Sequence, residues 1–171
     1  GRCLGLVGFG EIGRAVAHRA RALGMSVAAH DPFLPADDPA WNGVRRCGFD
    51  ELLGRADVLS LHVPLTEETW GLIDEKALGA MRPRAILINT ARGGGVGEAA
   101  LASALRLGRL GGAALDVFVT EPLTEQAAAV FAGTPNLILT PHVAGVTGEG
   151  NGRVSAVTVG NVLRELEHVD A

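Results

Sequence analysis

Four polar residues of this chain could act together on a substrate if its strands form one parallel sheet: Arg92, Asp116, Glu121 and His142. Each lies at the end of a short apolar segment or in the loop that follows one. An arginine can grip a carboxylate and polarise a neighbouring carbonyl. An imidazolium can donate a proton to a carbonyl oxygen while a hydride reaches the carbon, and a nearby glutamate would stabilise that charged form. Beside a nicotinamide, such a set would suffice for hydride transfer to a 2-oxo acid.

Each of these residues alone also has an ordinary structural explanation. Arg92 could be a surface charge after a strand, and His142, which follows a proline, could cap or pack. Asp116 could end a strand, and Glu121 could be a solvated loop residue. In an open α/β sheet, ligands bind outside the carboxyl ends of the strands. The functional interpretation therefore depends on all four residues reaching that edge.

A glycine-rich loop, Gly8-Phe9-Gly10-Glu11-Ile12-Gly13, follows the apolar run at residues 3–7 and precedes a helical pattern. This G-x-G-x-x-G spacing between a strand and a helix is typical of dinucleotide binding. Gly8 allows the tight turn, Gly10 lets the backbone approach a pyrophosphate, and Gly13 lets the helix lie close to the strand. The N–H groups of the first helical turn would then face the anion.

An acidic residue stands at the distance expected for an adenosine ribose. Residues 26–30 form a predicted second strand, and Asp31 follows it, about 20 residues past the loop. A carboxylate there accepts hydrogen bonds from ribose hydroxyls and repels a 2′-phosphate, so NAD is favoured over NADP. The alternative is a glycine turn followed by an unrelated Asp-Pro loop. The helix between them is expected to bury one face formed by Ile12, Ala15, Val16, Ala20 and Leu23.

Strands and helices alternate along the rest of the chain, which predicts a Rossmann-type doubly wound parallel sheet with helices on both faces in a single domain, residues 1–171. The run at residues 85–88 is typical of a strand buried on both faces. A long irregular loop follows residue 116, and Thr147 can cap a closing helix whose apolar face is Val159, Val162, Leu163 and Leu166. The other expected strands are 44–46, 57–61, 111–116 and 136–139, and the other expected helices are 49–53, 75–81 and 98–107.

The composition narrows the class of protein. The 171 residues suffice for one domain with a substantial core, and the net charge of −4 argues against nucleic acid or an anionic membrane as partner. No apolar run approaches the length of a membrane span. Cys3 and Cys47 are far apart in sequence, which favours free thiols in a reducing, cytoplasmic compartment. The sequence has no metal-binding motif, so no metal is expected.

The sequence resembles the cofactor-binding domain of the D-isomer-specific 2-hydroxyacid dehydrogenase family. The matching segments cover nearly the whole chain in the family's order. They are Leu4-Gly5-Leu6-Val7-Gly8-Phe9-Gly10-Glu11-Ile12-Gly13, His30-Asp31-Pro32, His62-Val63-Pro64-Leu65-Thr66, Ile88-Asn89-Thr90-Ala91-Arg92-Gly93, Ala114-Leu115-Asp116-Val117-Phe118 with Glu121-Pro122, and Thr140-Pro141-His142-Val143-Ala144-Gly145.

The resemblance implies a role for each matching residue. It implies that Arg92, Glu121 and His142 are the catalytic residues and that Asp116 holds the carboxamide of the nicotinamide. It also implies NAD as the cofactor. The expected cofactor-binding residues are Gly8, Gly10, Glu11, Ile12, Gly13, Asp31, His62, Val63, Pro64, Thr69, Thr90, Ala91, Arg92, Asp116, His142, Ala144 and Gly145.

The chain departs from the family pattern in two places. Gly97 stands where the family usually has aspartate, but glycine is an adequate N-cap and no catalytic effect is expected. Family members also carry a separate substrate domain, and Gly1 lies only seven residues before Gly8, so that domain is expected to be absent from this chain. The chain is therefore expected to bind NAD(H) with little or no turnover alone. Family members commonly form homodimers through this domain.

Two other functions stay open. The chain could be an NAD(H)-binding sensing module similar to the family's corepressor branch, in which the dinucleotide drives association. It could also be a Rossmann enzyme of different chemistry, such as an adenosylhomocysteine hydrolase relative, although the Arg–Glu–His set argues against this. The sequence does not identify the particular 2-hydroxy acid or the direction of the reaction.

Overall fold

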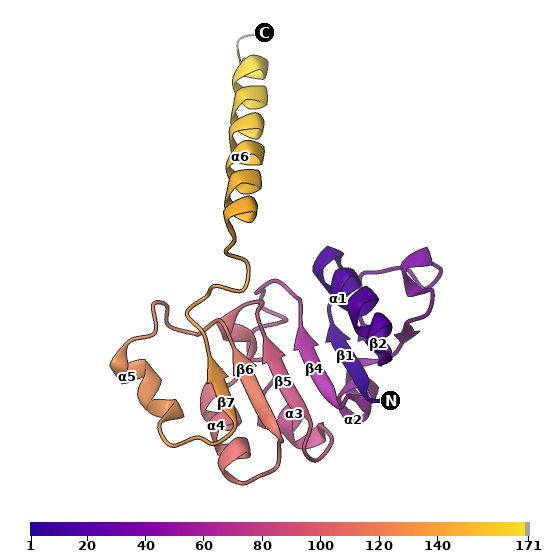
Figure 1. Ribbon diagram of the computed structural model, residues 1–171, viewed down its shortest axis with the longest axis vertical. Helices are drawn as coiled ribbons and strands as arrows, with labels where there is room; N and C mark the ends of the chain where they lie inside the picture. Colours follow the sequence, from indigo (N-terminus) through magenta and orange to yellow (C-terminus); the bar gives the residue numbers. More distant parts are fainter. Residues whose placement is uncertain (170–171) are drawn as a thin grey trace. The chain divides into compact units, whose positions relative to one another are not determined.

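The computed structural model describes residues 1–169 of the chain (Figure 1). The chain divides into two compact units, Gly1–Pro141 and a second unit that begins at His142. The first unit contains the whole sheet, and the second contains one long helix. Each unit is described by itself.

The first unit is built on a seven-stranded sheet in the order β3-β2-β1-β4-β5-β6-β7. Every pair of neighbouring strands is parallel. This arrangement confirms the predicted Rossmann-type doubly wound fold. The strands are β1 (Cys3–Val7), β2 (Ser26–His30), β3 (Arg45–Arg46), β4 (Val58–Leu61), β5 (Ile86–Asn89), β6 (Gly112–Leu115) and β7 (Leu137–Leu139).

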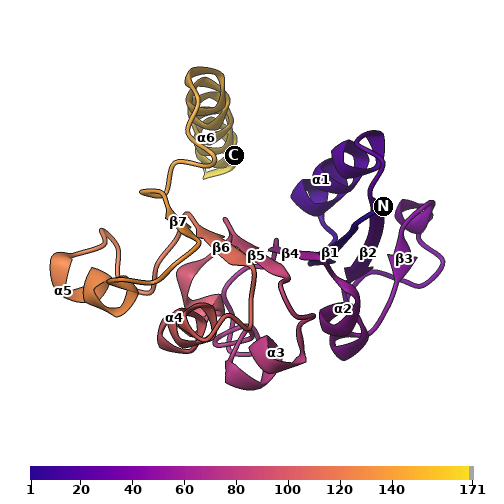
Figure 2. The same ribbon diagram turned by 60° about the horizontal axis from the view of Figure 1, so that its bottom comes forward.

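Helices cover both faces of the sheet, as Figure 2 shows: α1 lies on one face, and α2, α3 and α4 lie on the other. The structure adds α5, a single helical turn where the sequence pattern predicts only an irregular loop. The helices of this unit are α1 (Glu11–Ala22), α2 (Phe49–Arg55), α3 (Glu75–Ala80), α4 (Glu98–Arg106) and α5 (Glu125–Ala128), with 3-10 turns at Pro39–Trp41, Gly93–Gly95 and Ala129–Phe131.

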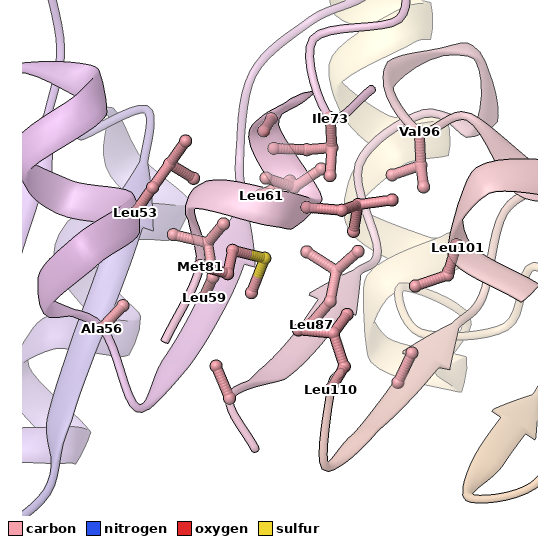
Figure 3. Packing of buried hydrophobic residues seen from close by; sticks show 14 of the residues in the cluster. Leu53, Ala56, Leu59, Leu61, Ile73, Met81, Leu87, Val96, Leu101 and Leu110 are labelled. Atoms are coloured by element: carbon pink, nitrogen blue, oxygen red, sulfur yellow. The ribbon is translucent and has the colours of Figure 1, made fainter. Parts of the chain in front are cut away.

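The larger hydrophobic core lies between the sheet and the helices α2, α3 and α4. Leu59, Leu61 and Leu87 project from the central strands, and Leu101 meets them from α4 (Figure 3). Each of these four side chains is at most 1% exposed. Burial of this kind supplies most of the stabilisation of a domain, because it removes apolar surface from water.

The smaller core lies under α1, and it corrects the predicted orientation of that helix. Gly13, Ala17 and Ala20 are the buried residues of α1. Of the predicted inward face, Ala20 is buried and Val16 packs against this core, but Ile12 and Leu23 are 68% and 82% exposed, and Ala15 is exposed as well. The prediction is wrong for these three residues because small residues, not large ones, form the contact face of a helix that packs this close to its strand.

The face of β5 on the α1 side is only partly covered, which corrects the expectation of a strand buried on both faces. Ile86 and Ile88 are half-buried, and Ile138 on β7, in the same row of the sheet as Ile88, is 65% exposed. The reason is topological. Right-handed crossovers that step from β4 towards β6 place their helices on one face, so they leave the opposite face of these strands uncovered.

The second unit consists of a connecting segment and helix α6 (Gly148–Val169). Thr147 caps this helix as predicted, since its Oγ1 accepts a hydrogen bond of 2.9 Å from the N–H of Gly150. The residues of its predicted apolar face are exposed: Val159, Val162, Leu163 and Leu166. Among residues 1–169, no helix is long and apolar enough to cross a membrane.

Replacing Leu87 with alanine tests the larger core. Leu87 is 0% exposed, so Leu87→Ala is expected to lower the free energy of unfolding by about 2–5 kcal/mol. Leu107→Ala is the matched control, because Leu107 is 64% exposed and its loss should change stability by at most about 0.5 kcal/mol. Chemical denaturation followed by circular dichroism measures both. Equal effects of the two substitutions would contradict the placement of the core.

Candidate active site

The carboxyl ends of the parallel strands all lie along one edge of the sheet. The loops that leave this edge contain most of the predicted site residues. The glycine loop follows β1, Asp31 follows β2, and His62 follows β4. Thr90, Ala91 and Arg92 follow β5, and Asp116 follows β6. The predicted position at this edge is therefore confirmed for Arg92 and Asp116, whereas the position predicted for His142, in the second unit, stays a prediction.

Two glycines of the loop meet close backbone contacts that a side chain would prevent. Gly8 has a φ of +89°, and a Cβ there would lie 2.7 Å from the carbonyl oxygen of His62. A Cβ on Gly13 would lie 2.5 Å from the carbonyl oxygen of Gly8. The loop is thus a tight turn, with the first turn of α1 packed directly against it. Both roles expected of these glycines are confirmed.

The N-terminus of α1 has the features of an anion-binding site. Its N-cap residue is Gly10, which has no side chain to accept the first helical N–H groups. A Cβ on Gly10 would meet open space within 4 Å. Free N–H groups and the positive end of the helix dipole favour a phosphate at such a position. The observed loop therefore fits the pyrophosphate of a dinucleotide.

Asp31 connects the end of β2 to the glycine loop. Its Oδ2 accepts a hydrogen bond of 2.8 Å from the N–H of Phe9. Its Oδ1 accepts bonds of 3.0 and 3.2 Å from the N–H groups of Phe33 and Leu34. A carboxylate offers about four acceptor positions, so these three bonds leave capacity for a ribose hydroxyl. Asp31 thus has a structural role at the loop in addition to the predicted one.

A cavity of about 210 Å³ connects the glycine loop to the loop that carries Arg92. Its lining consists entirely of residues expected at the site: Ile12, His62, Val63, Pro64, Thr90, Ala91 and Arg92. Pockets for drug-sized ligands measure roughly 300–1,000 Å³. This cavity is therefore suited to one ring of a larger ligand whose remainder lies along the sheet edge.

His62 is held largely in its neutral form. Burial lowers the pKa of its imidazole below the ordinary value of 6.5. Its Nε2 lies 3.0 Å from the Oγ of Ser60, a buried hydroxyl on β4. A neutral imidazole can both donate and accept hydrogen bonds. His62 can therefore orient a polar ligand group without adding charge to the cavity.

Asn89 fixes the loop that carries Arg92, although it is not among the site residues predicted from the sequence. The Asn89 side chain is fully buried, donates 2.9 Å to the carbonyl of Arg92 and accepts 3.0 Å from the N–H of Ala91. The Arg92 side chain is exposed, and its guanidinium donates to the carbonyl of Ala91. A polar residue that ends a buried strand is the sequence signal that could have revealed Asn89.

The loop after β6 contains the two predicted acidic residues. Asp116 is 3% exposed, and its Oδ1 accepts a hydrogen bond of 2.5 Å from the hydroxyl of Thr140. The Oε1 of Glu121 accepts a bond of 2.9 Å from the N–H of Phe118. A carboxylate buried as deeply as Asp116 needs such donors, because desolvation otherwise disfavours its charge.

The remaining predicted residues of the first unit are Thr69, in the connection after β4, and Glu11, within the glycine loop. The hydroxyl of Thr69 bonds the N–H of Thr66 and the carbonyl of Pro64, both at 2.7 Å, so Thr69 shapes its own loop. Glu11 is exposed in the first turn of α1. His142, Ala144 and Gly145 belong to the second unit, where His142 has a φ of +55°. Within residues 1–169, no three potential metal ligands gather.

The parallel sheet, the glycine loop and Asp31 together define a Rossmann-type dinucleotide-binding domain. A family model described as the NAD binding domain of D-isomer specific 2-hydroxyacid dehydrogenases matches residues 1–144. The chain belongs to this family, and the cofactor of the family's domain is NAD.

Relatives and solved structures agree with this assignment. The chain is 59% identical to the (S)-sulfolactate dehydrogenase of Chromohalobacter salexigens over 97% of this chain and 53% of the relative. It is 40% identical to the hydroxypyruvate reductase of Thermotoga maritima over 97% of this chain and 53% of that relative. The structure of a D-lactate dehydrogenase from Aquifex aeolicus, complexed with NAD and lactic acid, matches with a TM-score of 0.88 at 35% identity, over 98% of this chain and 54% of that one. The chain thus spans about half the length of these proteins.

The lowered pKa of His62 predicts a loss of stability in acid. Below about pH 6.5 the unfolded chain takes up a proton that the folded chain resists, so the free energy of unfolding falls as the pH drops towards the lowered pKa. His62→Gln removes this group. The difference in melting temperature between pH 7.5 and 5.5 should therefore be smaller in His62→Gln than in the unmodified chain.

His18→Gln is the control for this comparison, because His18 is an exposed histidine on α1. Thermal melts at both pH values measure the effect. An unchanged pH dependence in His62→Gln would show that this imidazole is not the group responsible.

Proposed function

We propose that this chain is the cofactor-binding part of an NAD-dependent oxidoreductase that transfers a hydride between NAD(H) and a D-2-hydroxy acid or its 2-oxo acid. One observation carries the proposal. The cavity at the strand ends is lined both by Ile12, from the phosphate-binding loop, and by Arg92, the candidate substrate-binding cation. Cofactor and substrate groups can therefore meet within one site.

The chain's own groups can hold each part of the dinucleotide. The first N–H groups of α1, after Gly10, would bind the pyrophosphate, and the remaining acceptor capacity of Asp31 would bind the adenosine ribose. The cavity beside Thr90 and Ala91 would receive the nicotinamide ring. Asp116, fixed by Thr140, would accept a hydrogen bond from the carboxamide.

The bound cofactor supplies the hydride. Arg92 grips the substrate carboxylate and polarises the 2-oxo group, since its guanidinium offers several donors in one plane. His142, as imidazolium, donates a proton to the carbonyl oxygen when the 2-oxo acid is reduced, and takes it back in the reverse direction. Glu121 stabilises the charged form of this histidine.

The substrate is a small 2-hydroxy acid whose remaining groups are recognised by polypeptide beyond this chain. The relatives named for sulfolactate and hydroxypyruvate are about twice as long as the matching region. A separate substrate domain would close the site and exclude water. We propose that this chain alone binds NAD(H) with little or no turnover of D-2-hydroxy acids.

We further propose that the protein is a cytoplasmic homodimer without nucleic-acid or membrane partners. Its two cysteines, Cys3 and Cys47, are free and buried, which fits a reducing compartment. Burial is also the main cause that raises the pKa of the Cys47 thiol, so this side chain stays protonated and unreactive. The homodimer rests on the family's common assembly.

Replacing Asp31 with asparagine tests the proposed cofactor site. The asparagine carbonyl oxygen would still accept from the N–H groups of Phe33 and Leu34, while its amide nitrogen would replace the acceptor of the Phe9 N–H. The side chain would no longer offer a carboxylate to the ribose or repel a 2′-phosphate. The ratio of NAD+ to NADP+ affinity, measured by calorimetry, is expected to fall at least about tenfold in Asp31→Asn. Asp38→Asn is the control, because Asp38 caps a 3-10 turn in the same connection through the N–H of Ala40.

The unmodified chain is measured alongside, with NAD+ and with D-lactate or D-glycerate added to detect NADH formation. Binding of NAD+ without appreciable NADH is the expected result. No binding of NAD+ by the folded chain would overturn the proposed function, and an unchanged NAD+ to NADP+ ratio in Asp31→Asn would overturn the role of Asp31.

A further inference from the structure

The loop at residues 116–121 is held by a carboxylate from another element. Glu98 begins α4, and its Oε1 accepts a hydrogen bond of 2.9 Å from the N–H of Val119. The preceding N–H, that of Phe118, donates to Glu121 within the loop. Two successive N–H groups are thus bound by two carboxylates, one from the loop itself and one, that of Glu98, from α4.

The same loop touches the segment that carries Arg92. A Cβ built on Gly93 would lie 1.9 Å from the carbonyl carbon of Phe118 and 2.0 Å from its oxygen. The two backbones therefore meet at a contact that excludes any side chain. Since Glu98 follows Gly93 by five residues, the segment 92–98 contacts the loop at both Phe118 and Val119.

The position of Glu98 in its helix alone would not require the contact with Val119. An acid in the first turn is stabilised by the helix dipole wherever it points. Glu75 holds the equivalent first position of α3 and is exposed. Glu98 is half-buried, and its carboxylate turns to a loop 21 residues later in the chain. This difference indicates a function of Glu98 beyond that of an ordinary helix-terminal acid.

We propose that Glu98 is a positioning residue that holds the 116–121 loop against the segment of Arg92, and thereby shapes the nicotinamide end of the cofactor site. The inference rests on the proposed function, because only that function places the nicotinamide beside Asp116 and its loop. Asp116 itself is anchored at its base, where its N–H donates 3.0 Å to the carbonyl of Asn89. Glu98 holds the part of the loop that follows Asp116, through its hydrogen bond with the N–H of Val119.

Comparing two ligands isolates this end of the site. NADH and ADP-ribose share the adenosine, the pyrophosphate and the second ribose, but only NADH has a nicotinamide. Glu98→Ala is expected to weaken NADH binding about tenfold while ADP-ribose binding changes less than about twofold. Glu98→Gln keeps an acceptor for the N–H of Val119, so it should restore NADH affinity to within about threefold of the unmodified chain.

Glu75→Ala is the matched control, since it removes a first-turn acid from a helix without touching the 116–121 loop. Calorimetric titration of each variant with both ligands gives the affinities, and thermal melts report stability separately. An unchanged ratio of NADH affinity to ADP-ribose affinity in Glu98→Ala would overturn the inference, and this includes an equal loss of affinity for both ligands. Failure of Glu98→Gln to restore NADH affinity would overturn it as well. If the unmodified chain binds neither ligand, the proposed function is overturned, and the inference with it.

Discussion

All strands of the sheet run in the same direction, and the rest of the site depends on this constraint. Parallel strands bring every carboxyl end to one edge, so residues as distant in sequence as Ile12, His62 and Arg92 line a single cavity. The constraint also explains the tight backbone contacts. Loops that leave neighbouring strands at the same edge must pass within a few ångströms of each other. Gly8 and Gly93 occur where two such loops touch, because any side chain there would meet a carbonyl group.

Much of this edge could be predicted from the sequence, because its determinants are local. Glycine spacing after an apolar run predicts the loop, and an acid after the second strand predicts Asp31 beside it, which the bond to Phe9 confirms. The positions of Arg92 and Asp116 after their strands follow from the alternation of strands and helices. The catalytic roles of Arg92, Glu121 and His142 stay predictions.

Other features could not be predicted because they depend on long-range packing. The rotation of α1 is set by contact between Gly13 and Gly8, so Ile12 and Leu23 face outward although they fit an apolar stripe. The partial exposure of Ile88 follows from the handedness of the crossovers, which a single-strand pattern does not contain. Glu98 resembles an ordinary helix-terminal acid until its bond to Val119, 21 residues away, is seen.

We propose that one edge of this sheet holds NAD, with its pyrophosphate at the start of α1 and its nicotinamide in the cavity beside Arg92. A crystal structure of this chain with NAD+ tests this binding mode. We expect pyrophosphate oxygens within hydrogen-bond distance of the N–H groups that follow Gly10, a ribose hydroxyl on Asp31, and the nicotinamide ring in contact with Ala91. Density for NAD+ away from the glycine loop, or with the adenine in the cavity beside Arg92, would contradict it.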